Sequence, residues 1–235
     1  MRARKLVAIH QPNFFPWLGY FAKIARADVF IFLDCVQFPK TGGTWTNRVQ
    51  MIVGGKAAWV SVPVVRIYHG VRRIDEMHFN SATPWREHLL KVLQTNYGRA
   101  PFYEKVAPFL TELVNQPTDM IADYNMTIVR ALAGKLELDN SKLVASSAIA
   151  VCGQATEMLC ALVHAVGGTA YLAGGGASDY QEDALFVQNN IELIYQNFQQ
   201  PVYPQFNTTE FVPGLSIVDA LMNCGFQGTR ALLES

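Results

Sequence analysis

The chain has 235 residues, half of them hydrophobic, and 19 basic residues balance 19 acidic ones. This length can bury a substantial core in one domain, and the neutral balance gives no overall field that would attract nucleic acid or an anionic membrane. No apolar run is long enough for a signal peptide or a membrane span, and the four cysteines are scattered. We therefore expect a reduced, cytoplasmic protein without a nucleic-acid partner or a membrane span.

The first predicted strand leads directly into a stiff polar loop. The apolar run 6–9 suits a buried strand, and His10, Gln11 and Asn13 follow it in a loop that contains two prolines. Each proline fixes its own φ and favours an extended residue before it, so these side chains should have fixed directions. Residues 17–27 then fit a helix.

A second apolar run, residues 28–34, fits a strand parallel to the first and ends at Asp34. The strand-helix-strand unit lacks the Gly-x-Gly-x-x-Gly turn of dinucleotide folds, so we expect no nicotinamide or flavin dinucleotide. Ligands of open parallel sheets bind at the carboxyl ends of the strands. His10 and Asp34 are therefore candidate catalytic bases. The alternatives are a loop histidine that bonds neighbouring backbone and an aspartate that caps the next loop.

The loop after Asp34 contains polar side chains, glycines, an aromatic ring and a cation. Such a loop could fold over an anionic or sugar-like ligand. Arg48 suits a carboxylate or phosphate, because a guanidinium binds either bidentately. Trp45 is the tryptophan in a polar setting, whereas Trp17 and Trp59 occupy helix and strand positions that predict a place in the core. The candidate binding residues are Gln11, Asn13, Gln37, Trp45, Asn47 and Arg48.

The middle of the chain predicts a hairpin, a further strand and three helices. Residues 49–53 and 57–65 are rich in β-branched residues around a Gly-Gly turn, which indicates a hairpin at an edge of the sheet. Residues 71–79 fit another strand. Helical spacing of apolar residues predicts helices over 84–96, 101–115 and 118–136. We expect residues 84–136 to be a helical insertion or cap; the sequence leaves open whether it is a lid or the surface of a homodimer.

The alternation of strands and helices then resumes. It predicts strands over 142–145, 169–173 and 191–195, helices over 154–166 and 181–189, and a final helix capped by Ser216. Gly174, Gly175 and Gly176 lie between a strand and a helix, where free N–H groups can hold a phosphate or carboxylate. This glycine run, together with Tyr180, is a second candidate binding site, or else only a flexible turn.

These elements predict a single α/β domain over residues 1–235. Its core would be an open, mostly parallel, Rossmann-like sheet flanked by helices, with an edge hairpin and a helical insertion. The histidines outside the first loop lack the spacing of zinc ligands, and the cysteines form no close pairs, so no metal site is predicted.

Several motifs of the chain resemble the WbqC-like family. They span nearly the whole length and comprise residues 10–21, 33–34, 36–38, 47–48, 59–63, 171–174, 180, 203–205 and 215–219. The family is associated with bacterial O-antigen and surface-polysaccharide gene clusters and is described as glycine or aminoacyl transferases. The resemblance therefore implies an acyl or aminoacyl transferase in surface-polysaccharide biosynthesis. It assigns no catalytic residue.

The sequence supports two classes of function. The first is a transferase that joins glycine or another small acyl group to the amine of a nucleotide-linked sugar; His10 or Asp34 would take the proton, while Arg48 and the glycine run hold phosphates. No cofactor is firmly implied. The donor is left open between ATP, through an acyl-adenylate, and an acyl-carrying compound, because the His-x-Gly-His signature of nucleotidyltransferases is incomplete. The second class is a non-catalytic accessory protein that binds a nucleotide-sugar.

Overall fold

A five-stranded parallel sheet forms the centre of one half of the molecule. The computed structural model describes residues 4–151, 154–174 and 182–234. Within them the strand order is β5-β2-β1-β6-β7, and all neighbours are parallel, which confirms the predicted α/β class. The first strand thus lies at the centre, as in Rossmann-like sheets. The strands are β1 (Leu6–His10), β2 (Val29–Phe32), β5 (Leu143–Ala145), β6 (Ala170–Ala173) and β7 (Glu192–Tyr195).

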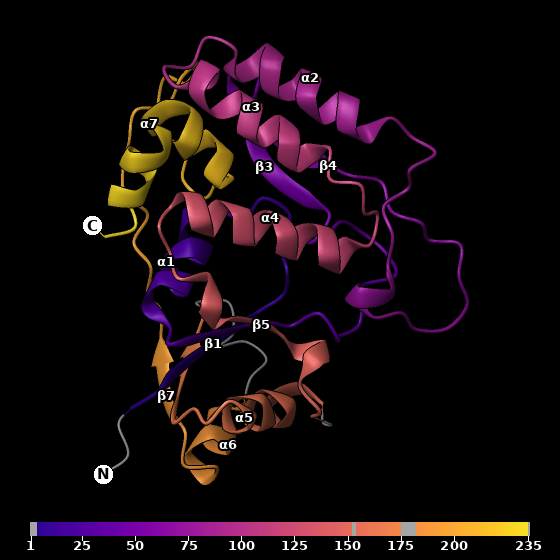
Figure 1. Cartoon of the computed structure of the whole chain (residues 1–235), viewed down its shortest axis with the longest axis vertical. Helices are drawn as coiled ribbons and strands as arrows, with labels where there is room; N and C mark the ends of the chain where they lie inside the picture. Colours follow the sequence, from indigo (N-terminus) through magenta and orange to yellow (C-terminus); the bar gives the residue numbers. More distant parts are fainter. Residues whose placement is uncertain (1–3, 152–153, 175–181, 235) are drawn as a thin grey trace.

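Helices cover both faces of this sheet (Figure 1). One face carries α1 (Leu18–Arg26) and α4 (Ile121–Lys135), and the other carries α5 (Ala155–Ala165) and α6 (Asp183–Gln188). Successive strand residues point to opposite faces. Ala8 and Phe30 accordingly pack in the core beside α1 and α4, whereas Val7 and Ile31 pack with α5 and α6. Burial on both faces explains why these strands are nearly uninterrupted apolar runs.

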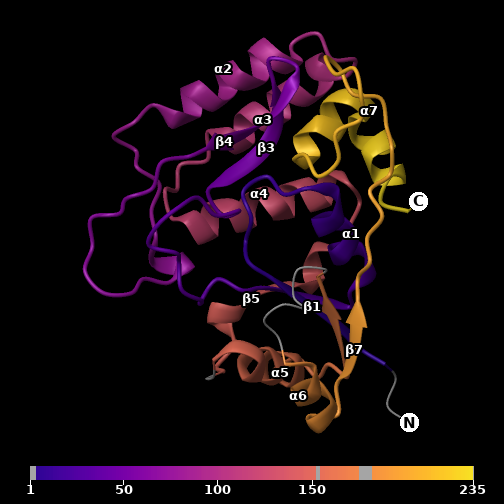
Figure 2. The same cartoon turned by 180° about the vertical axis from the view of Figure 1, so that it is seen from behind.

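The predicted hairpin is present, but its expected place at an edge of the sheet is wrong. It forms a separate two-stranded antiparallel sheet. Val49, Met51 and Val60 are buried in the core that continues from the α4 side of the parallel sheet. Figure 2 shows the hairpin beside the helices of the second half. Those elements are β3 (Arg48–Val53), β4 (Lys56–Ser61), α2 (Trp85–Tyr97), α3 (Tyr103–Val114) and α7 (Ile217–Ala231).

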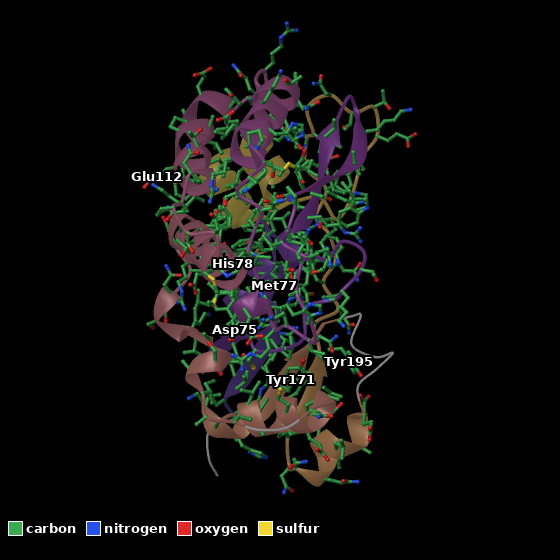
Figure 3. The ribbon with its side chains drawn as sticks, turned by 90° about the vertical axis from the view of Figure 1, so that its right-hand side faces the viewer. Asp75, Met77, His78, Glu112, Tyr171 and Tyr195 are labelled. Atoms are coloured by element: carbon green, nitrogen blue, oxygen red, sulfur yellow. The ribbon has the colours of Figure 1, made fainter. Side chains whose placement is uncertain are left out.

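The strand predicted over residues 71–79 is also wrong. The segment contains a short 3-10 helix, Ile74–Glu76, with isolated bridges around it. Arg73 donates to the carboxylate of Asp75 at 2.7 Å, so a local ion pair stabilises a turn where the apolar spacing suggested a strand. Asp75 and Met77, labelled in Figure 3, lie at mid-height of the molecule, and the Met77 carbonyl accepts the N–H of the first residue of α4.

A buried carboxylate joins the elements of the second half. Asp219, in the first turn of α7, accepts hydrogen bonds from Tyr97 Oη at 3.1 Å, Tyr203 Oη at 2.9 Å and Gln205 Nε2 at 3.1 Å. The Ser216 hydroxyl caps α7 by accepting the N–H two residues later at 3.2 Å, as the sequence predicted. The carboxylate therefore connects α2, the extended segment before α7, and α7 itself.

Asn125 of α4 holds two polar loops in place. Its side chain is fully buried, and Nδ2 donates to the carbonyls of Pro12 and Thr46, both at 2.8 Å. Next to it the Phe14 N–H donates to the Trp45 carbonyl at 2.8 Å. The loop after β1 and the loop before β3 therefore lie side by side with a fixed backbone.

Replacement of Asn125 by alanine should lower the free energy of unfolding by about 1–3 kcal/mol, because two buried carbonyls would lose their donor. Urea denaturation measures this loss. Thr127→Ala, at an exposed position of the same helix, is the matched control and should change stability by no more than about 0.5 kcal/mol. An equally small effect at both positions would contradict the role given to Asn125.

Candidate functional site

A cavity of about 910 Å³ lies at the carboxyl ends of β1 and β6. It is lined by the loop after β1, the start of α1, the loops before β3, the end of β6 and the segment 196–199 after β7. The strand order reverses at this point, since β2 lies on one side of β1 and β6 on the other. This switch point is where open α/β sheets bind their ligands, and the volume falls in the range of small-molecule sites.

The cavity brings together several residues that the sequence predicted. Asn13 is 1% exposed, and its Nδ2 has no hydrogen-bond partner among the residues that the structure describes. A buried donor without an acceptor costs free energy that a ligand acceptor would recover. The predicted residues in the lining are His10, Gln11, Asn13, Gln37, Trp45 and Gly174.

Asp34 and Asn47 lie outside this lining, and backbone or loop contacts occupy their side chains. The Asp34 carboxylate accepts hydrogen bonds from Ser146 Oγ at 2.7 Å and from the Ser147 N–H at 2.9 Å, just after β5. Asn47 Oδ1 accepts the N–H of residue 44 at 3.0 Å, and its Nδ2 donates to the Val62 carbonyl at 2.9 Å. Both side chains hold loops that border the cavity. The other predicted residues, Gly175, Gly176 and Tyr180, lie outside the described residues.

A row of three indoles runs from the cavity to the surface. The ring centroids of Trp17 and Trp45 are 5.5 Å apart, and those of Trp45 and Trp59 are 4.9 Å apart. Trp17 lines the cavity while it packs, partly buried, against the core, whereas Trp59 is 41% exposed, so its predicted place in the core is wrong. Arg48 also lies outside the lining, with its guanidinium 4.2 Å from the centre of the Trp59 ring. That contact holds the outer end of the row.

Lys23, which α1 presents to the cavity, was not predicted from the sequence. Lys23 is 2% exposed, and its Nζ donates to the Ile9 carbonyl at 3.1 Å. Within the described part of the chain it forms no salt bridge. Burial lowers the pKa of Lys23 from 10.5 to about 7. The available signal was a lysine on the apolar side of a helix, between Tyr20 and Ile24, where lysine is rarely found without a partner.

His10 lies near Lys23 in the same cavity. Its Nδ1 is 3.2 Å from the Gln11 carbonyl, so a proton on Nδ1 makes that hydrogen bond and leaves Nε2 as an acceptor. Burial, and secondly the charge of Lys23, lower the pKa of His10 to about 3. The imidazole packs edge-on against two aromatic rings, with its centroid 4.8 Å from that of Tyr20 and 5.7 Å from that of Trp17. The imidazole is therefore neutral and held in one orientation at pH 7.

The opposite wall of the cavity comes from β6 and from the chain after β7. Tyr171, labelled in Figure 3, lies low in the molecule on β6 and lines the cavity. Its ring stacks on that of Phe186, with the two ring centroids 5.0 Å apart. Gln196 donates to the Gly19 carbonyl at 2.6 Å, which joins this wall to α1. A side chain at Gly19 would collide with the rings of Trp17 and Phe198, so glycine allows these walls to meet.

The low pKa of Lys23 should make stability depend on pH. Between pH 7 and 9 the unfolded chain binds more protons at this lysine than the folded protein, so the free energy of unfolding should rise with pH. The rise relative to Lys23→Met should reach up to about 1.4 kcal/mol per pH unit. Denaturation of both proteins at several pH values measures it, and parallel stability curves would show that Lys23 is not shifted.

Among the described residues, no helix is long and apolar enough to cross a bilayer. The model of the WbqC-like protein family matches residues 11–231. The chain is also 28% identical over 224 residues to the uncharacterized protein Rv1507c of Mycobacterium tuberculosis, and the match covers 94% of each chain. No solved structure matches significantly. Because the family match spans both halves of the fold and most of the cavity, the chain belongs to the WbqC-like protein family.

Proposed function

We propose that the protein is a transferase that joins glycine or another small acyl group to the amine of a nucleotide-linked amino sugar in bacterial surface-polysaccharide biosynthesis. The observation that carries this proposal is the presence of a neutral His10 and a low-pKa Lys23 in one cavity. Titratable groups shifted by their surroundings are typical of proton-transfer sites. The family resemblance supports the substrate class.

The cavity lining suits a nucleotide-linked sugar. Its volume of about 910 Å³ is larger than a single amino acid would fill. Trp17 and Trp45 offer apolar ring faces on which a sugar or base can pack. Gln11 and Gln37 add amide donors and acceptors for hydroxyl groups. The site therefore combines flat apolar contacts with polar groups at its rim.

In the proposed reaction the amine nitrogen attacks the carbonyl carbon of the activated acyl group. The new N–C bond forms, the bond from that carbon to the leaving group breaks, and the amine loses a proton. His10 Nε2 would accept this proton, and the unpartnered Nδ2 of Asn13 would donate to the oxyanion that develops on the carbonyl. The Asp34 carboxylate takes no part, because its hydrogen bonds hold the turn after β5.

His10→Gln should lower kcat about 10²–10⁴-fold while the Kd for the sugar nucleotide stays within about tenfold, because the base is lost and the shape is kept. The assay combines purified protein, nucleotide-linked amino sugars and glycine, either with ATP or as a pre-activated glycyl donor. Mass spectrometry detects the added glycyl residue.

His88→Gln, an exposed histidine of α2, is the matched control and should keep full turnover. Unchanged turnover in His10→Gln would remove His10 from the role of base. Binding of the sugar nucleotide without transfer from any donor would instead identify a non-catalytic accessory protein.

A further inference from the structure

The cavity contains a buried cation without an anion. Lys23 is the cationic side chain among the described residues of the lining, and its Nζ contacts one carbonyl, that of Ile9. Gly174 lies close by, since a Cβ built there would be 3.8 Å from Nζ, in ordinary contact. Burial of an unpaired ammonium is costly. A ligand that supplies negative charge at this point would remove that cost.

A second group in the same cavity also lacks a partner. Asn13 Nδ2 is buried and donates to no acceptor in the described residues. Lys23 and Asn13 both line this cavity, and an ammonium together with an amide N–H favours a ligand rich in acceptor oxygens. Phosphate groups are such ligands, and a sugar diphosphate fills more of about 910 Å³ than a small carboxylate does.

We propose that the Lys23 ammonium binds the diphosphate of a nucleotide-linked sugar at the switch point of the sheet. This inference rests on the proposed function for the identity of the substrate, but its test measures binding alone. Lys23 thereby takes the role of phosphate-binding cation that the sequence predicted for Arg48. The Arg48 guanidinium packs on Trp59, outside the cavity lining.

The bound diphosphate would also change His10. The charge of Lys23 is one of the two causes that lower the pKa of His10, after burial. A negative group beside Lys23 compensates that charge and raises the pKa of the imidazole again. His10 thus becomes a stronger base when the sugar nucleotide is bound, which couples substrate binding to proton transfer.

Calorimetric titration with uridine, guanosine and thymidine diphospho-sugars tests the proposal. The diphosphate of these compounds is a diester without a proton to exchange near pH 7, so any proton uptake comes from the protein. We expect net proton uptake near pH 7 in buffers of different ionisation enthalpy, because Lys23 is partly neutral there and binds as the ammonium.

Lys23→Met should weaken binding at least tenfold and abolish the proton uptake. Lys91→Met, an exposed lysine of α2, should bind like the wild type, and Arg48→Met should lose less affinity than Lys23→Met. Loss of affinity in Arg48→Met but not in Lys23→Met would overturn the proposal. The absence of binding by all three compounds, or affinity unchanged in Lys23→Met, would overturn it as well.

If Lys23→Met does not fold, Lys23→Gln, which keeps a polar side chain of similar length without the charge, should show the same loss of affinity. The measurements also distinguish failure of the transferase proposal from failure of the diphosphate-site proposal. Binding that depends on Lys23, without glycyl transfer from any donor, would refute the transferase and leave the diphosphate site standing. Transfer that persists in Lys23→Met with unchanged KM would refute the diphosphate site alone.

Discussion

The hydrogen bond from Lys23 Nζ to the Ile9 carbonyl joins α1 to the central strand at the point where the cavity opens. A single carbonyl does not compensate a buried ammonium, so the amine is partly neutral at pH 7. The same charge helps to keep His10 neutral. The protonation states in the cavity therefore follow from burial in the first place and from the charge of Lys23 in the second, and a bound anion would change both groups together.

Around this pair, many polar side chains act by holding backbone. Asn125 fixes the loop after β1 against the loop before β3, and Asp34 holds the turn after β5. Asn47 fixes the loop that carries Trp45. These contacts leave the groups that face the cavity, including Asn13 and His10, in fixed positions. Such supporting contacts are what keep a functional site preorganised, and the family motifs contain residues of both kinds.

The sheet and most helices were predictable because buried parallel strands and amphipathic helices have distinct apolar spacings. The β-branched runs around the Gly-Gly turn indicated the hairpin but not the elements against which it packs, so its position was not predictable. Within the site, the rim at the end of β1 followed from the order of elements. The partner of Asp34 is Ser146, 112 residues away, and the low pKa of Lys23 depends on tertiary burial. Neither can be deduced from local sequence.

Lys23 is a buried amine whose pKa lies near neutrality. NMR titration of the lysine side-chain carbons, with Lys23 assigned by its substitution, measures this pKa directly. The transition should lie near pH 7 in the free protein and move upward when a diphospho-sugar is bound. A transition near the ordinary value of 10.5, unchanged by the sugar nucleotide, would contradict this near-neutral pKa.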